Sequence, residues 1–204
     1  MVNLRKLQEC VTNCMQAGDV PRNNESFIKS AIMIIFSLNK NNQQKDIILI
    51  KRKNNLRKHA GQIAFPGGRF ENIDKDLKQT AFRETKEEIN LSKEHLRVLG
   101  ALPIFYTGTG YAVKPFLSVL KEGVDYKKFL KADGNEVEKI LIINSKDLLT
   151  PSNQIRVKAP KNSKMKKTWK VNFQNENIWG LTARVLVTIS AGLNLREYPP
   201  CDDI

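Results

Sequence analysis

Apolar and polar residues follow one another along the chain in patterns that predict three helices and several strands. Leu4, Leu7, Val11 and Cys14 are spaced three or four residues apart, as on one face of an amphipathic helix, and Pro21 ends the pattern. Short apolar stretches bounded by polar or turn residues predict strands, the first two of which form a hairpin. The strands are expected over residues 31–38, 46–52, 96–105, 113–120 and 137–143.

The remaining segments contain two longer helices and two basic or charged stretches. Residues 74–90 and 178–193 carry apolar side chains at helical spacing and are predicted to be helices. Residues 125–135 form a charged insertion. Residues 158–170 contain six lysines and are expected to form a loop or a hairpin. Because strands are mixed with a few helices, the pattern predicts an α/β sandwich around a single core.

The length of 204 residues suits one domain with a sizeable core. We expect a helical extension over residues 1–25, followed by a single domain over residues 26–204. No apolar run approaches the roughly 20 residues needed to cross a bilayer, and the N-terminus lacks the apolar core of a signal peptide. An odd count of 3 cysteines fits a reducing compartment, so a cytoplasmic protein without a membrane partner is expected.

The charge balance favours an anionic partner. Lys and Arg total 34 against 21 Asp and Glu, which gives a formal net charge of +13. Such an excess is typical of proteins that bind nucleic acid, phosphorylated small molecules or an acidic surface. Charge alone does not choose among these partners, because a lysine-rich codon usage produces the same composition without any function.

An acidic helical turn carries the strongest chemical signal. In residues 83–88, RETKEE in one-letter code, the side chains of Glu84, Glu87 and Glu88 project from one helical arc about 100° wide. Helix-spaced like charges cost roughly 0.2–0.5 kcal/mol per pair. A hard divalent cation relieves this repulsion, and Mg²⁺ typically binds carboxylates together with substrate phosphates. The alternative is a solvated acidic face neutralised by neighbouring basic residues.

A corner without side chains precedes this helix. Residues 65–68, FPGG in one-letter code, end a short apolar segment in two successive glycines. Glycines let a metal ion or a phosphate approach the backbone closely, and a carbonyl oxygen there can serve as a ligand. The corner therefore favours a metal site at the acidic turn over a solvated acidic face.

Together, the corner and the acidic helix resemble the box of the Nudix hydrolases, G-x5-E-x7-R-E-U-x-E-E-x-G-U, in which U is aliphatic. The chain follows this box from Gly68 through residues 83–88 to Leu91. The departures from the box are Asp74 for the first Glu, eight rather than seven residues between Asp74 and Arg83, Thr85 for an aliphatic residue, and Asn90 for the last Gly. Asn90 is a mild change, because Asn tolerates the left-handed conformation that ends a helix. Asp74 is expected to cap the helix at its start.

The segment before the corner resembles the signature of coenzyme A diphosphatases within this family, LLTxR(S/A)x3Rx3Gx3FPGG. Arg52, Arg57, Gly61 and residues 65–68 fall in register with it. Two specific motifs in the right order make a chance match remote. The resemblance covers most of residues 28–193. Its departures are Ile50 for Thr and Lys53 for a small residue.

This resemblance implies a fold, a reaction and a metal. The expected fold is the Nudix fold, an α/β/α sandwich with a mixed β-sheet. The expected reaction is hydrolysis of the diphosphate of coenzyme A or its thioesters to 3′,5′-ADP and (acyl-)4′-phosphopantetheine. Mg²⁺ or Mn²⁺ would be held by Glu84, Glu87, Glu88 and Gly67, would neutralise the diphosphate and would lower the pKa of a bound water.

The resemblance also implies roles for basic and acidic residues around the metal. Arg83 is expected to orient a glutamate. Glu136 is the candidate for an extra ligand or the general base, and Glu84 is its rival for the base. Guanidinium groups pair bidentately with phosphate. The residues expected to bind substrate are Arg52, Arg57, Lys58, Gly67 and Gly68.

Two alternatives keep the family and change the function. The first is a Nudix hydrolase of another nucleoside diphosphate derivative, such as ADP-ribose, NADH or capped RNA, and the net charge supports the RNA version. The second is a non-catalytic Nudix domain that binds a nucleotide or RNA. The pattern over residues 52–68 argues against the RNA version and favours a small-molecule diphosphate. The three retained glutamates favour an enzyme over a non-catalytic domain. The sequence leaves the oligomeric state open, with a homodimer as one option.

Overall fold

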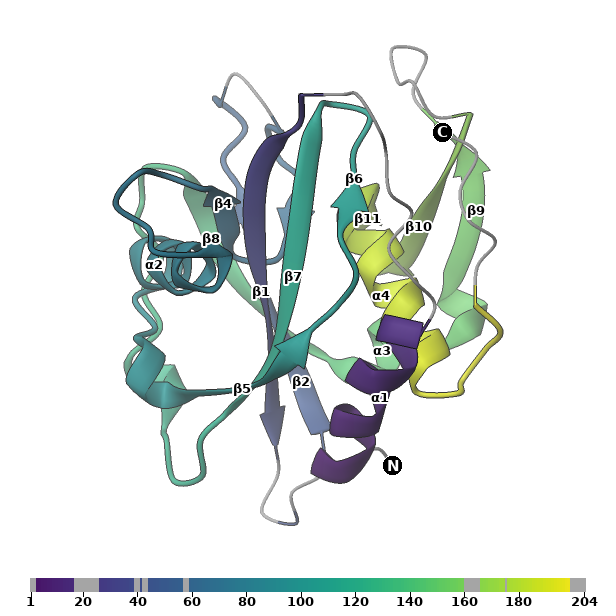
Figure 1. Cartoon of the computed structure of the whole chain (residues 1–204), viewed down its shortest axis with the longest axis horizontal. Helices are drawn as coiled ribbons and strands as arrows, with labels where there is room; N and C mark the ends of the chain where they lie inside the picture. Colours follow the sequence, from purple (N-terminus) through teal and green to yellow (C-terminus); the bar gives the residue numbers. More distant parts are fainter. Residues whose placement is uncertain are drawn as a thin grey trace.

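The computed structural model describes residues 3–16, 26–38, 41, 44–56, 59–159, 166–174 and 176–198. Its centre is an eight-stranded mixed sheet, in which β1 and β7 run parallel and the other pairs antiparallel (Figure 1). The main order is β3-β2-β1-β7-β5, with β4 paired to β1, β6 to β7 and β8 to β2. The strands are β1 (Ile28–Leu38), β2 (Gln44–Arg52), β3 (Ile63–Ala64), β4 (Gly67–Arg69), β5 (Leu96–Ala101), β6 (Phe105–Tyr106), β7 (Tyr111–Leu120) and β8 (Val137–Asn144).

Helices cover both faces of this sheet, as Figure 1 shows. Alternate side chains of β1 point to opposite faces, since the side-chain period of a strand is two. Met33 and its neighbours two residues away pack with α2 (Leu77–Ile89), whereas Ile34 and its neighbours pack with α1 (Leu4–Gln16) and α4 (Leu181–Gly192). The predicted α/β/α sandwich with a mixed sheet is confirmed. The expected single core was wrong, because the sheet divides the buried apolar residues into two clusters.

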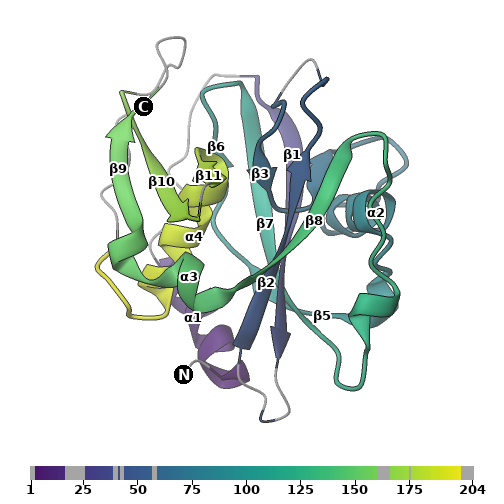
Figure 2. The same cartoon turned by 180° about the vertical axis from the view of Figure 1, so that it is seen from behind.

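A second, three-stranded sheet lies beside α4 (Figure 2). It contains β9 (Gln154–Lys158), β10 (Lys167–Phe173) and β11 (Glu176–Trp179) and follows the short helix α3 (Ser145–Leu149). β9 and β10 pair antiparallel from Lys158 and Lys167 onward, which confirms a hairpin for the lysine-rich segment in the described residues; residues 160–165 lie outside them. Trp169 on β10 is only 6% exposed and packs in the core.

Two predicted elements differ from the structure in their extent. The helix predicted from residue 178 begins only at Leu181, because residues 178–179 belong to β11. Gly180 between them has a φ of 65°, a left-handed conformation that glycine readily adopts. The predicted strand over 96–105 is divided into β5 and β6 around Pro103, which has no N–H to donate to a neighbouring strand. The sequence also missed α3 and three short 3₁₀ helices, η1 (Lys93–His95), η2 (Tyr126–Lys128) and η3 (Pro151–Asn153).

The apolar face of α1 is used within the molecule. Leu7, Cys10 and Cys14 are fully buried, and α1 packs mainly on α4. Both thiols are free, with Sγ atoms 3.9 Å apart, and they contact backbone carbonyls of α4. The two cysteines therefore contribute to packing between helices.

Candidate active site

The acidic helix α2 begins and ends with side-chain and backbone caps. Asp76 is the N-cap, and its Oδ1 accepts a hydrogen bond of 2.7 Å from the backbone N–H of Gln79. Asn90 ends the helix in the left-handed region, with φ 57° and ψ 26°, as its substitution for Gly in the box led us to expect. The expectation that Asp74 caps the helix was wrong, since that role belongs to Asp76. The spacing of Asp76 and Gln79 is that of a capping box, a signal that sequence reasoning missed.

The three glutamates of α2 differ in burial. Glu88 has a side chain 7% exposed, Glu84 16% and Glu87 57%. The neighbouring arc of the helix, which includes Ala81 and Thr85, is buried against the sheet. The arc of carboxylates thus runs from the interface with the sheet out to solvent.

Glu84 and Glu88 both lie against the glycine corner. Gly67 donates its backbone N–H to Oε2 of Glu88 at 2.9 Å. A Cβ on Gly68 would collide with the carboxylate of Glu84, so any other residue there would have to displace this carboxylate from the corner. Gly67 has φ 154°, and a Cβ there would meet the backbone of β1. The corner and the acidic helix therefore form one site, as their order in the sequence predicted.

Glu136 reaches the same site from a distant part of the chain. It lies just before β8, and Asp133 orients it by accepting its backbone N–H. The backbone N–H of Asp133 donates to the carbonyl of Glu88 at 3.1 Å, which ties this loop to the end of α2. Glu136 is close enough to act electrostatically on both Glu84 and Glu88. Sequence reasoning singled out Glu136 and missed Asp133.

Arg52 joins the two acidic segments from the end of β2. Its Nη1 donates to Oε1 of Glu88 at 3.3 Å, and its Nη2 donates to Oε2 of Glu136 at 2.6 Å. Its buried Nε has no partner among the described residues. The structure thus brings Arg52 to the glutamates. Arg57 and Lys58, which were expected to bind substrate beside it, lie outside the described residues.

Arg83 is the centre of a second network on the other side of the arc. Its Nε and Nη2 bond to Asp74 at 3.0 and 3.2 Å, and its Nη1 bonds to Glu84 at 3.0 Å and to Glu87 at 2.9 Å. Nη2 also donates to the carbonyl of Arg69 at 2.9 Å. Asp74 is a buried anchor that additionally accepts the hydroxyl of Thr80. These contacts fix Arg83 beneath the glutamates.

Burial changes the acidity of the carboxyl groups. It raises the pKa of Glu88 to about 8, although the N–H of Gly67 opposes the shift. Burial also raises the pKa of Glu84, with Arg83 opposing. Arg83 in turn holds the pKa of Asp74 below its usual range. The two glutamates at the corner are thus the carboxylates whose ionised form most needs compensating charge.

The donor set at the corner fits a hard divalent cation. Mg²⁺ and Mn²⁺ prefer carboxylate and carbonyl oxygens. At the corner, two glutamate carboxylates lie next to the backbone of the two glycines, which has no side chains to block a cation. Within the described residues, no three acidic, histidine or cysteine side chains already converge in a metal-ligating arrangement. The carboxylates instead contact Arg52, Arg83 and the N–H of Gly67. A cation would therefore be added to carboxylates that are already paired.

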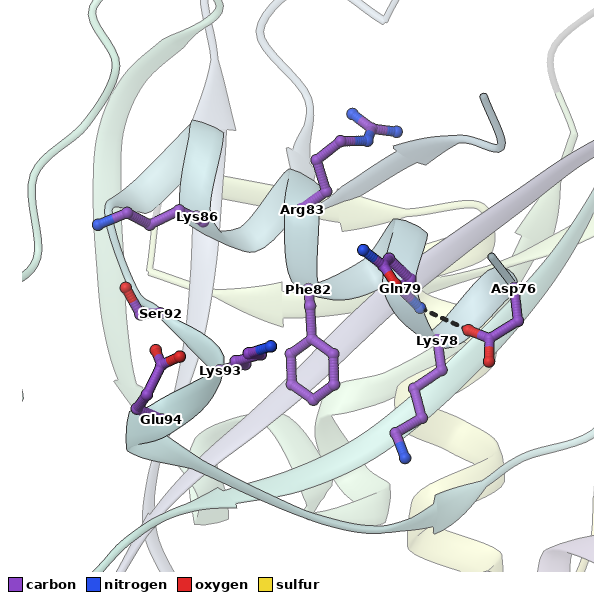
Figure 3. Close-up of a pocket in the computed structure, with 9 residues that line it drawn as sticks. All are labelled: Asp76, Lys78, Gln79, Phe82, Arg83, Lys86, Ser92, Lys93 and Glu94. Atoms are coloured by element: carbon purple, nitrogen blue, oxygen red, sulfur yellow. Dashed lines mark hydrogen bonds between the residues drawn. The ribbon is translucent and has the colours of Figure 1, made fainter. Parts of the chain in front are cut away.

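A pocket opens on the outer side of α2, next to this site. Figure 3 shows the ring of Phe82 between Lys78 and Lys93, with Arg83 pointing away from the ring. None of the glutamates of the acidic arc lines this pocket. The pocket therefore borders the candidate site through Arg83 without containing its carboxylates. Its remaining lining residues are Asp76, Gln79, Lys86, Ser92 and Glu94.

Comparison with known proteins identifies the family. The NUDIX domain family matches residues 29–161. A curated relative from Photorhabdus laumondii subsp. laumondii, named "Uncharacterized Nudix hydrolase NudL", is 33% identical over 140 residues, which cover 69% of this chain and 73% of the relative. The chain belongs to the Nudix family. A Klebsiella pneumoniae relative of the same name is 29% identical over 153 residues, 75% of this chain and 78% of the relative.

A solved structure agrees with this family at the level of the fold. The crystal structure of a MutT/nudix family protein from Enterococcus faecalis has a TM-score of 0.50 and 16% sequence identity, and the match covers 86% of this chain and 64% of that chain. At this identity the likeness concerns the fold alone.

Membership in the family establishes the class of reaction. The protein is a Nudix hydrolase, which acts on phosphoric anhydride bonds in nucleoside diphosphate derivatives. Nudix hydrolases generally require divalent metal ions as cofactors and act on small-molecule nucleotide derivatives as substrates. None of the helices within the described residues is long and apolar enough to cross a bilayer.

Proposed function

We propose that this Nudix hydrolase cleaves the diphosphate of coenzyme A or its thioesters into 3′,5′-ADP and (acyl-)4′-phosphopantetheine. The observation that carries the proposal is the contact of Arg52, from the coenzyme A signature, with Glu88 of the Nudix box. Signature and box thus meet in one site. Gly61 and residues 65–68 support the same assignment, because they match the signature in register.

The acidic residues at the glycine corner are proposed to hold the metal. Glu84, Glu87, Glu88 and Gly67 would bind Mg²⁺ or Mn²⁺, because each offers a hard oxygen donor within one helix turn and the adjoining corner. When bound, the cation supplies neutralisation of the diphosphate charge and activation of water. Arg83 is proposed as a positioning residue, since it bonds to both Glu84 and Glu87 and is itself fixed by Asp74.

The remaining residues are proposed to bind the diphosphate and to take up the proton of the attacking water. Arg52 is proposed to bind the substrate phosphates, and Gly67 and Gly68 to let them approach the backbone. Arg57 and Lys58 keep the same proposed role on the strength of the signature. Glu136 is the candidate base or extra ligand because its side chain is 56% exposed beside Arg52. Glu84 remains the rival base.

Two broader assignments accompany this function as proposals. Residues 1–25 are proposed as a helical extension of a single domain over residues 26–204. The burial of Leu7, Cys10 and Cys14 against α4 supports the view that the extension shares the core of that domain. The protein is also proposed to be cytoplasmic, where an enzyme acting on small molecules would encounter coenzyme A.

A comparison of substrates tests the proposal. Coenzyme A, dephospho-coenzyme A, NADH, ADP-ribose and capped RNA are offered at matched concentration with Mg²⁺ or Mn²⁺, and products are identified by mass spectrometry. We expect the highest kcat/KM for coenzyme A or a thioester, with 3′,5′-ADP as product. The Glu87→Gln variant is the control for contaminating activity. Faster turnover of capped RNA, NADH or ADP-ribose would overturn the coenzyme A assignment.

A further inference from the structure

We propose that Arg52 and the divalent cation compete for the carboxylate of Glu88, so that binding of the cation releases Arg52 from Glu88 to the diphosphate of the substrate. The inference rests on the proposed function, in which the glutamates of α2 are the cation ligands. It adds a mechanism by which cation and substrate reinforce each other, with Arg52 as the exchanging group.

Within the described residues, the side-chain hydrogen bonds of Arg52 go to two acids of the site. Its Nη1 and Nη2 bond to Glu88 and Glu136, which come from α2 and from the loop before β8. Its Nε is buried and has no partner within the described residues. Its side chain is 20% exposed, so that solvent or a ligand can reach it. The guanidinium is therefore held at this position by the two carboxylates.

Arg83 provides the contrast. It also bonds to two acids of the arc, but its Nε and Nη2 bond to Asp74, whose side chain is 1% exposed, and Nη2 bonds to a backbone carbonyl. These anchors remain whatever binds to the glutamates. The structure thus contains one fixed arginine and one arginine whose side-chain partners both belong to the site.

A cation at the corner weakens the contacts of Arg52. Oε2 of Glu88 already accepts the N–H of Gly67, and Oε1 accepts Arg52. A divalent cation on Glu88 shares its negative charge with Arg52 and repels the guanidinium at short range. A diphosphate next to the cation offers Arg52 new bidentate acceptors. Cation and diphosphate therefore favour each other's binding, since coupling between two ligands is reciprocal.

Binding of Mn²⁺ to the substrate-free protein distinguishes two cases. In one, Arg52 competes with the cation; in the other, Arg52 holds the glutamates in place for the cation. Free Mn²⁺ is measured by electron paramagnetic resonance during titration of the wild type and of Arg52→Gln. Wild type and all variants are titrated in the same buffer at the same pH. Arg97→Gln, at an exposed position on β5, is the matched control for loss of one positive charge. We expect Arg52→Gln to lower the Kd for Mn²⁺ by at least about threefold, whereas Arg97→Gln leaves it unchanged.

The opposite result has a clear meaning. If Arg52 held the glutamates in place for the cation, Arg52→Gln would raise the Kd, as we expect for Arg83→Gln. An unchanged or raised Kd in Arg52→Gln overturns the competition. Arg52→Lys serves if Arg52→Gln unfolds: it keeps the charge but cannot bond to both carboxylates as a planar fork, so its Kd is expected between those of wild type and Arg52→Gln.

Two further readouts separate this inference from the function on which it rests. Glu84→Gln should weaken Mn²⁺ binding in the same titration. If wild type and Glu84→Gln bind Mn²⁺ equally, the metal site itself is wrong and the competition falls with it. If binding depends on Glu84 but is not tightened in Arg52→Gln, only the competition is wrong. Under the proposal, Arg52→Gln also raises KM for the diphosphate substrate, so affinities for cation and substrate change in opposite directions.

Discussion

Individual side chains of the candidate site are arranged so that each buried charge has an opposite charge or a backbone N–H nearby. Glu88 accepts Gly67 and Arg52, and Asp74 accepts Arg83 through two nitrogens. An unpaired buried carboxylate would cost several kcal/mol. Pairing with Arg83 offsets this cost for Asp74, whose pKa is lowered, but pairing offsets it only in part for Glu88, whose pKa rises to about 8. Glu136 differs, because its side chain is more than half exposed. It can therefore change partners without exposing or burying a charge.

Glutamine substitutions distinguish the metal ligands from the base. Glu84→Gln removes a proposed ligand and is expected to raise the Kd for Mn²⁺ about tenfold or more and to lower kcat. Glu136→Gln, if Glu136 is the base, lowers kcat by about 10²–10⁴-fold and leaves Mn²⁺ binding unchanged. Steady-state kinetics and Mn²⁺ titration measure the two effects.

The reverse pattern assigns the base to Glu84. Glu136→Gln would then keep its kcat, while Glu84→Gln would lose kcat even at Mn²⁺ concentrations that saturate its weakened metal site. Glu71→Gln, in the exposed part of the loop before α2, is the matched control and should change neither quantity.

Whole elements were predictable where local sequence determines them. The C-terminal end of α2 was predicted, since Asn90 adopts the left-handed conformation that its substitution for Gly implied, whereas the start of the helix was assigned to Asp74 and not to its N-cap, Asp76. The glycine corner met the acidic helix as expected, because few residues separate them. The convergence of Glu136 could be proposed from family resemblance, but the hydrogen bonds of Asp133 that produce it link segments 45 residues apart, Asp133 and Glu88, and local pattern does not encode them.

Elements were missed where tertiary contacts outweigh local pattern. Apolar residues at helical spacing extend into β11, yet pairing with β10 makes residues 176–179 a strand. The two cores were also hidden, because β1 is apolar on both faces and therefore shows no alternation. Sequence periodicity thus identified the elements better than it identified their ends or partners.

The contact between α1 and α4 gives a prediction at the scale of elements. A Cβ on Gly192 would stand 2.5 Å from Sγ of Cys14 and 2.8 Å from Sγ of Cys10, in a fully buried interface. Alanine gains helix propensity of up to about 1 kcal/mol, but overpacking costs about 1–3 kcal/mol. We expect Gly192→Ala to lower the free energy of unfolding by about 1–2 kcal/mol, measured by urea denaturation.

A double-mutant cycle isolates this contact. Cys14→Ala removes the nearest sulfur and makes room for the new methyl group. The double variant should therefore be more stable than the sum of the two single effects predicts. Simple additivity, or a stabilised Gly192→Ala, would contradict close packing of α1 on α4.

The molecule as a whole combines a net charge of +13 with a candidate site that concentrates acids. Glu84, Glu88 and Glu136 lie close to one another, and only Arg52 and Arg83 contact them among the described ion pairs. A positive surface raises the local concentration of anionic substrate. The acidic site at the same time attracts cations. Within this site, burial raises the pKa of Glu88 to about 8, so that this group changes its ionisation near neutral pH.

Folding stability should therefore decrease with rising pH through Glu88. Its pKa is about 8 in the folded protein and about 4.3 in the unfolded chain, so the folded state holds the extra proton between these values. Stability from this group is complete below about pH 4.3 and is lost as pH rises toward 8, at up to roughly 1.4 kcal/mol per pH unit. In Glu88→Gln this contribution is absent. The difference in unfolding free energy between wild type and Glu88→Gln, measured by urea denaturation without divalent cations, should thus shift in favour of the variant as pH rises from about 5 to about 8. Glu87→Gln, on the exposed side of the same helix, should track the wild type; a pH-independent difference for Glu88→Gln would mean that Glu88 is ionised in the folded protein throughout this range.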